Sequence, residues 1–167
     1  MKKTFAIILV ALFPLFAFGQ KFGHINSADL VPIMPDYTAA QNELQSLQKQ
    51  YEEEIKYMEN EFTKKVDDYE KQRETLPENI RQRREEEIMQ SRQRAEQYVN
   101  DCQINLSNKS NELMETIQNK LHKAIQAVGE EGGYICIFDM AGGVVPFVNT
   151  TMTTDVTEAV KAKLGIK

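Results

Sequence analysis

The stretch that decides the fold is Tyr37–Leu76, YTAAQNELQSLQKQYEEEIKYMENEFTKKVDDYEKQRETL, which contains no proline and no glycine. Its apolar residues recur at intervals of 3, 4, 4, 3, 4, 4 and 3, and they define an apolar seam: Leu44, Leu47, Tyr51, Ile55, Met58, Phe62, Val66 and Tyr69. This eleven-residue repeat corresponds to about 3.67 residues per turn, so the seam stays nearly straight or coils slightly to the right. The pattern predicts one long amphipathic helix and is not the heptad repeat of a leucine zipper.

A turn signal follows at Thr75-Leu76-Pro77-Glu78. Proline is tolerated in the first turn of a helix, and Thr75 and Glu78 have the spacing of a capping box. The eleven-residue spacing then continues through a return helix, Pro77–Val128, at these positions: Ile88, Ser91, Ala95, Val99, Cys102, Leu106, Ser110, Leu113, Ile117, Leu121, Ala124 and Val128. Two helices on one spacing, joined by a tight turn, should pair in antiparallel fashion.

We therefore expect a helical hairpin arm at residues 36–128, with its tip near residues 75–78. Asp36 is the expected N-cap of its first helix. Forty residues at about 1.5 Å per residue give an arm of about 60 Å. Because the seam is thin and includes the small polar side chains Ser91 and Ser110, we expect an arm that can bend.

The segments on either side of the arm, residues 20–35 and 129–167, are interpreted as a small β-rich body, so that the fold class is α+β. Strands are expected at Phe22–Asn26, Tyr134–Met140 and Val144–Asn149, the last two joined as a hairpin through Ala141-Gly142-Gly143. Short helices are expected at Ala28–Ile33, capped by Ser27, and at Asp155–Leu164, and Gly129 is expected to cap the long return helix.

A body of 55 residues has little core of its own, and its strands leave open edges. Small scaffolds of this size are commonly stabilised by oligomerisation. The sequence therefore predicts self-association through the sheet of the body.

The first nineteen residues are predicted to be a signal peptide that is cleaved near Gly19. Lys2 and Lys3 precede the apolar run Phe5–Phe18, and Ala17-Phe18-Gly19 places small residues at the cleavage point. The run is too short to cross a hydrocarbon core of about 30 Å as a helix. Removing two lysines changes the net charge from −5 to −7, and such an acidic chain is a poor general nucleic-acid binder.

The chain resembles the Skp/OmpH family of periplasmic chaperones along its mature length. The resemblance is carried by FGHINS at 22–27, MPDYTAAQNEL at 34–44, EEGGYICIFD at 130–139 and TTDVTEAVKAKL at 153–164, in the order of the family. It implies a homotrimer with a central barrel-like body, from which three helical arms project around a cavity. It also implies a holdase that keeps unfolded outer-membrane β-barrel proteins soluble in the periplasm without ATP.

No cofactor, nucleotide or metal is expected. The glycines lack the GxxxxGK[ST] pattern of a phosphate-binding loop, and the cysteines and histidines lack metal-ligand spacing. No catalytic residues are identified, so the chain is not expected to be an enzyme. The alternative function is a structural adaptor that docks folded envelope components through the arm tips.

Arginines gather around the expected tip and are candidates for contacting anions at the membrane surface: Arg73, Arg81, Arg83, Arg84, Arg92 and Arg94. The planar guanidinium suits carboxylate and phosphate groups. The competing interpretation is local pairing, because Arg81 and Glu85, Arg83 and Glu87, and Arg92 and Glu96 are each four residues apart.

Apolar residues outside the seam are candidates for contact with clients: Tyr57, Met89, Tyr98 and Ile104. Methionine and tyrosine adapt to varied partners, although single exposed apolar residues are also ordinary. Cys102 and Cys136 are expected to remain unbridged, because Cys102 lies about 39 Å along the helix from the body. His24 and His122 are expected to be a strand side chain and a solvated helix residue.

The charge is unevenly distributed, with −5 in residues 36–72 and zero in residues 73–96. Well-known members of the resembled family are strongly basic, and this chain departs from them. Long-range attraction of acidic clients and a basic lipopolysaccharide site therefore do not follow from the resemblance.

Overall fold

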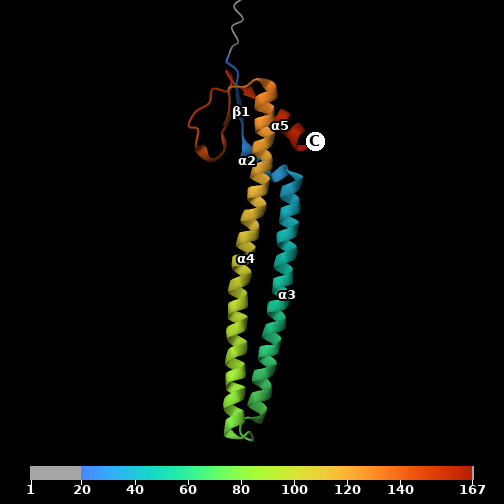
Figure 1. The fold of residues 1–167 in the computed structure, drawn as a ribbon, viewed down its shortest axis with the longest axis vertical. Helices are drawn as coiled ribbons and strands as arrows, with labels where there is room; N and C mark the ends of the chain where they lie inside the picture. Colours follow the sequence, from blue (N-terminus) through green and yellow to red (C-terminus); the bar gives the residue numbers. More distant parts are fainter. Residues whose placement is uncertain (1–19, 167) are drawn as a thin grey trace, which may run out of the picture.

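The protein is described by a computed structural model that covers residues 20–166. The expected signal peptide lies outside the described residues. Two long helices dominate the molecule: α3 (Pro35–Gln72) has 38 residues and α4 (Glu78–Gly132) has 55 residues (Figure 1). At about 1.5 Å per residue, α3 is about 57 Å long and α4 about 82 Å long. Because α4 is the longer helix, its last turns run past the start of α3 and lie beside β1 and α5 (Figure 1).

The two helices lie side by side along the seam that the eleven-residue spacing predicted. Every seam residue named above is buried or half-buried on both helices. Polar contacts across the helices run in opposite order along the chain: Lys120 pairs with Asp36 at 2.6 Å, and Lys109 pairs with Glu43 at 3.0 Å. The spacing thus identified the contacting faces of both helices.

The turn between the helices differs in detail from the prediction. Helix α3 ends at Gln72 rather than Leu76. The Thr75 hydroxyl donates a hydrogen bond to the carbonyl oxygen of Gln72 at 2.8 Å, and Pro77 is the N-cap of α4 without a side-chain cap. The predicted capping box of Thr75 and Glu78 is therefore wrong, because the threonine hydroxyl donates instead to one of the free carbonyl groups at the end of α3.

The caps of the first helices also differ from the prediction. Met34 is the N-cap of α3 and Pro35 occupies its first turn, while the carboxylate of Asp36 accepts from Lys120 instead of capping. Helix α2 (Ser27–Leu30) is capped by Asn26, whose side-chain oxygen accepts from the amide of Ala28 at 3.2 Å. Proline suits the first turn of a helix, where its missing N–H is not needed.

The remaining elements form a small body around one three-stranded parallel sheet. Its strands are β1 (Phe22–Ile25), β2 (Cys136–Asp139) and β3 (Thr154–Asp155), in the order β2-β1-β3. The other elements are the 3-10 turns η1 (Val31–Ile33) and η2 (Ala141–Gly143) and the helix α5 (Thr157–Leu164).

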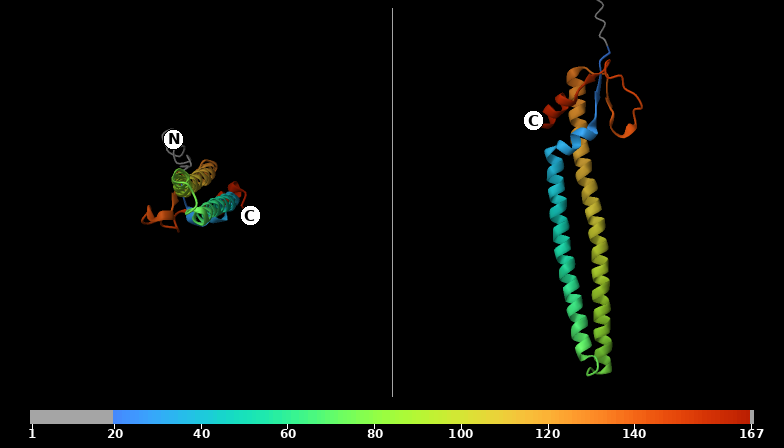
Figure 2. Two further views of the ribbon diagram at one scale, coloured as in Figure 1. Left: turned by 90° about the horizontal axis from the view of Figure 1, so that it is seen from below. Right: turned by 180° about the vertical axis from the view of Figure 1, so that it is seen from behind.

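The predicted hairpin with a strand at Val144–Asn149 is wrong. The carboxylate of Asp139 accepts from the amide of Ala141 at 3.0 Å, and the left-handed Gly142 and Gly143 then turn the chain away from the sheet. Pro146 lies in the middle of the expected strand and has no N–H for a strand ladder. The segment forms a loop on the side opposite α5 (Figure 2) and returns as β3, parallel to β1.

One apolar core joins the body to the start of the arm. Met34 and Val160 are completely buried within it, and its buried members come from residues 25–40 and 117–164: Ile25, Leu30, Met34, Ala40, Ile117, Leu121, Ala124, Val128, Val156, Val160 and Leu164. Helix α4 does not stop at Val128 but continues to Gly132, where the left-handed Gly133 (φ 64°) caps it. The last turns of α4 are thus part of the arm helix and of the body core at once.

Acidification is expected to weaken the body through Asp139, whose carboxylate accepts from the amides of Ser27 and Ala141, both at 3.0 Å. Burial raises the pKa of Asp139, but these hydrogen bonds outweigh it and hold the pKa below its ordinary value. Because the folded pKa is depressed, the stabilisation is complete above the unfolded carboxyl pKa of about 4 and disappears as the pH falls through the folded value.

The variant Asp139→Ala should unfold more easily by about 1 kcal/mol near neutral pH, since two amides lose their acceptor. Urea denaturation at a series of pH values measures this difference, which should shrink below about pH 4. The exposed Asp67→Ala is the control and should change little. A difference that stays constant down to about pH 2 would contradict the role of the Asp139 carboxylate.

Candidate functional site

The tip of the arm holds a small pocket of about 160 Å³ between the two helices. Its lining comes from both helices: Lys65, Asp68, Tyr69, Gln72, Leu76, Arg84, Glu87 and Ile88. The Tyr69 hydroxyl donates a short hydrogen bond to the carboxylate of Glu85, and this bond raises the pKa of Tyr69. The contact ties α3 to α4 directly above the turn.

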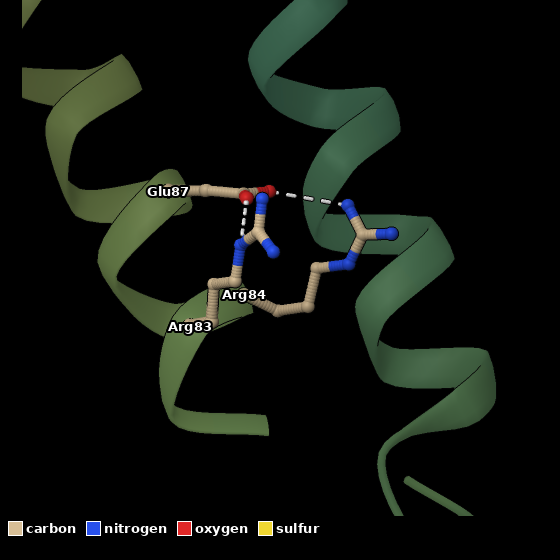
Figure 3. Close-up of polar contacts among 3 residues, drawn as sticks. All are labelled: Arg83, Arg84 and Glu87. Atoms are coloured by element: carbon tan, nitrogen blue, oxygen red, sulfur yellow. Dashed lines mark hydrogen bonds and ion pairs between the residues drawn. The ribbon is translucent and has the colours of Figure 1, made fainter. Parts of the chain in front are cut away.

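Two of the tip arginines share one glutamate. Arg83 Nε and Arg84 Nη1 each lie 3.1 Å from a carboxylate oxygen of Glu87 (Figure 3). The Arg84 side chain extends toward α3 in that view, which agrees with its place in the lining of the tip pocket. The expected pair of Arg83 and Glu87 is confirmed, and each charge here has a partner on its own helix.

The other tip arginines differ in their pairing. Arg92 pairs with Glu96 at 2.8 Å as expected, but Arg81 pairs with Glu78 rather than Glu85. Glu85 is engaged by the Tyr69 hydroxyl, a contact across the helices that spacing along one helix could not reveal. Arg73 and Arg94 make no ion pair with any side chain in residues 20–166, so they are the arginines whose guanidinium groups remain available to an anion.

The apolar candidates outside the seam do not form a single patch. Tyr57, Met89 and Ile104 are exposed by 60%, 62% and 51%, and Met89 lies about 22 Å along α4 from Ile104. Tyr98 belongs to the seam after all, because its half-buried ring packs edge-on against Tyr51 with ring centroids 6.2 Å apart.

A second, wider groove of about 630 Å³ lies nearer the body and was not predicted from the sequence. Glutamine, asparagine and serine side chains dominate its lining, with two leucines: Gln41, Asn42, Leu44, Gln45, Gln48, Leu106, Ser107 and Ser110. We call it the amide groove. The signal that would have revealed it is the near absence of charge in residues 38–48 and 102–111.

One face of the body sheet combines the apolar Phe22 and Phe138 with the polar His24 and Asp155. In parallel strands paired residues share a face, so Phe22 and His24 lie on the same side as Cys136 and Phe138. The rings of Phe22 and Phe138 stack with centroids 6.1 Å apart. The opposite face meets the core, since Gly23 lies against Ile137 and the α5 cap Val156.

The loop beside this face exposes further large apolar side chains. Val144, Phe147 and Met152 are exposed by 84%, 77% and 79%, far more than the apolar residues of the arm. His24 is buried at the base of the loop, where its Nδ1 lies 2.8 Å from the Thr153 hydroxyl. The loop therefore adds exposed apolar side chains next to a sheet face on which Phe22 and Phe138 are half-buried.

Comparison with known families identifies the chain. Residues 21–164 match the family described as outer membrane protein, OmpH-like. The chain belongs to the OmpH-like family. A search among curated proteins found no match. Family membership associates this OmpH-like chain with periplasmic chaperones that act on outer-membrane proteins. Members of the family are chaperones and not enzymes.

The remaining candidate groups of the OmpH-like chain lie apart from one another. Cys102 is buried in the seam, whereas Cys136 is exposed on β2, and neither is bridged. His122 is exposed on α4. Within residues 20–166 no three metal-ligating side chains come together, and no helix there is apolar over a long enough stretch to cross a bilayer.

Proposed function

We propose that this chain is an ATP-independent periplasmic holdase, which binds unfolded outer-membrane β-barrel proteins between helical arms and prevents their aggregation. The observation that carries the proposal is the arm itself. Two helices of 38 and 55 residues project from a small body whose loop exposes large apolar side chains. Such a shape suits enclosure of a large, irregular partner, and family membership supports the class of client.

The oligomer that this function requires is a homotrimer formed by residues 20–35 and 129–167, with residues 36–128 as the arm. Parallel sheets normally have both faces covered, but Phe22 and Phe138 on one face stay partly exposed in the described part of a single chain. Copies of the same face can cover one another around a rotation axis. The resemblance to the Skp/OmpH family supplies the number three.

The holding step needs no chemical energy. An unfolded barrel exposes alternating apolar residues and unpaired strand edges that aggregate in water. Arms around a cavity separate one such chain from its neighbours while making many weak contacts. Release follows when the client folds into the membrane, because its native barrel is more stable than the bound state.

Several finer assignments belong to this proposal. Residues 1–19 act as a signal peptide with cleavage near Gly19, which delivers the chain to the periplasm. Tyr57, Met89 and Ile104 offer exposed apolar contacts to clients. The half-buried ring of Tyr98 offers less surface to a client, because it packs against Tyr51. At the tips, the unpaired arginines named above provide transient contact with anionic headgroups.

Suppression of client aggregation tests the function directly. A urea-unfolded outer-membrane barrel is diluted into buffer with or without the mature protein, and light scattering is followed over time. We expect scattering to be suppressed near one trimer per client, with no change on adding ATP. Full aggregation at a few-fold excess of trimer would overturn the proposal.

Removing the arm tip, Tyr69–Ile88, separates the holdase from an adaptor that docks a folded partner through the tip pocket. A holdase should keep part of its capacity, because the rest of the arm still encloses the client. An adaptor should lose all binding. Complete loss of binding to a folded partner in the shortened protein, with the trimer intact, would therefore favour the adaptor.

A further inference from the structure

The amide groove is unusual in this chain because it carries no charge. Residues 38–48 contain one charged side chain, Glu43, and residues 102–111 contain one, Lys109. These two side chains form an ion pair across the helices at 3.0 Å, so that their charges cancel. Charged residues make up 27% of the chain as a whole, and a neutral groove in such an arm calls for a physical explanation.

The amides of the groove have hydrogen-bonding capacity to offer. Gln41, Asn42 and Gln45 are exposed, and their side chains bond to no other described residue. Gln48 donates to Glu52 at 2.8 Å and keeps its carbonyl oxygen free. Each free amide presents two donors and an acceptor with two lone pairs, the same pair of functions as a peptide backbone.

The spacing of the amides suits an extended polypeptide. Gln41, Gln45 and Gln48 are four and three residues apart, so they share one face of α3 at intervals of about 6 and 4.5 Å. Backbone groups on one side of an extended strand recur about every 6.6–6.8 Å. Leu44 and Leu106 line the same groove and can receive an apolar side chain of that strand.

We propose that the amide groove binds extended, uncharged segments of the client through hydrogen bonds from these amides to the client backbone. This inference rests on the proposed holdase function and assigns it a binding site. Membrane-spanning strands of a barrel are such segments, with alternating apolar residues and unpaired N–H and C=O groups. A neutral lining accepts them without burying an unpaired charge, which would weaken binding. The neighbouring groove shares Asn42, Gln45 and Gln48 and ends at the charged Lys49 and Glu52, so the neutral surface is confined to the amide groove itself.

Substituting the three glutamines by methionine separates hydrogen bonding from apolar contact. The triple variant Gln41→Met, Gln45→Met and Gln48→Met keeps side-chain length and helix propensity while making the groove more apolar. The amide proposal predicts that affinity for a urea-unfolded barrel falls about tenfold or more, from the loss of several hydrogen bonds. If apolar contact governs binding, the affinity should rise instead.

A matched control exists on the other helix. Gln90, Gln93 and Gln97 are exposed at spacings of three and four residues and do not line the groove. Their triple methionine variant should bind the barrel like the unmodified protein. Circular dichroism and the molar mass of both variants establish that helices and trimer are intact.

A second measurement needs no triple variant. A photocrosslinking amino acid is placed at Asn42, or at Gln93 as its control, and irradiated with the unfolded barrel bound. We expect client crosslinks mainly from Asn42. Unchanged or raised affinity of the groove variant would overturn the proposed role of the amide groove alone, and so would stronger crosslinking from Gln93. Failure of the unmodified protein to bind any barrel would overturn the holdase function as well.

Discussion

Replacing Val144, Phe147 and Met152 by serine is expected to convert the proposed trimer of this OmpH-like chain into monomers. These apolar side chains are exposed by 84%, 77% and 79% in the single chain. Exposed apolar patches of this kind usually mark a protein interface. The loop that carries them packs its Thr153 hydroxyl against His24, so it adjoins the sheet face that carries Phe22 and Phe138.

The loss of trimer stability is expected to be large because the body is small. Burying a side chain such as phenylalanine contributes about 1.5–3 kcal/mol, and a trimer would bury each of the three residues three times. Their loss therefore removes much of the free energy that holds the copies together. None of the three belongs to the core of the single chain, so each monomer should keep its helices.

Light scattering coupled to gel filtration measures this change as a threefold fall in molar mass. The control is Tyr57→Ser, Met89→Ser and Ile104→Ser, which removes exposed apolar residues of the arm. We expect the control to remain trimeric. A loop variant that is still a trimer would show that other surfaces hold the assembly, and a monomeric unmodified protein would contradict trimerisation itself.

Truncating Met34 is the second large effect, with an expected loss of about 2–5 kcal/mol in the free energy of unfolding. Its side chain is 0% exposed and lies in the core together with residues of β1, α4 and α5. Met34 is also the N-cap of α3, so it stands where the body passes into the arm. A cavity there should loosen both parts together.

Urea denaturation at one fixed protein concentration measures the loss for Met34→Ala, since the stability of an oligomer depends on concentration. Met89→Ala is the matched control, because Met89 is 62% exposed and its truncation should cost less than about 0.5 kcal/mol. Equal losses for the two variants would contradict a continuous core between arm and body.

The arm could be predicted from the sequence almost completely. Intervals of three and four residues placed the seam on both helices, and the structure buries or half-buries every one of those positions. Two tip ion pairs, Arg83 with Glu87 and Arg92 with Glu96, were also predictable from a spacing of four. All these features depend on residues that are neighbours along one helix.

Several of the predictions that failed involve partners distant in the chain. Glu85 bonds to Tyr69 of the other helix, and this contact leaves Arg81 to Glu78. The amide groove exists only where two uncharged segments of different helices face each other. Tyr98 was placed outside the seam, since its contact with Tyr51 depends on how the helices align.

By itself, the sequence determined the helical arm, its contacting faces and the place where it turns. The reason is that a helix forms its backbone hydrogen bonds between residues four apart, so the sequence pattern that specifies it is local. Only the tertiary structure decided the parallel order β2-β1-β3, because β1 pairs with strands more than a hundred residues away, such as Phe22 with Cys136. Parallel pairing needs a long crossover, and here the whole arm is that crossover.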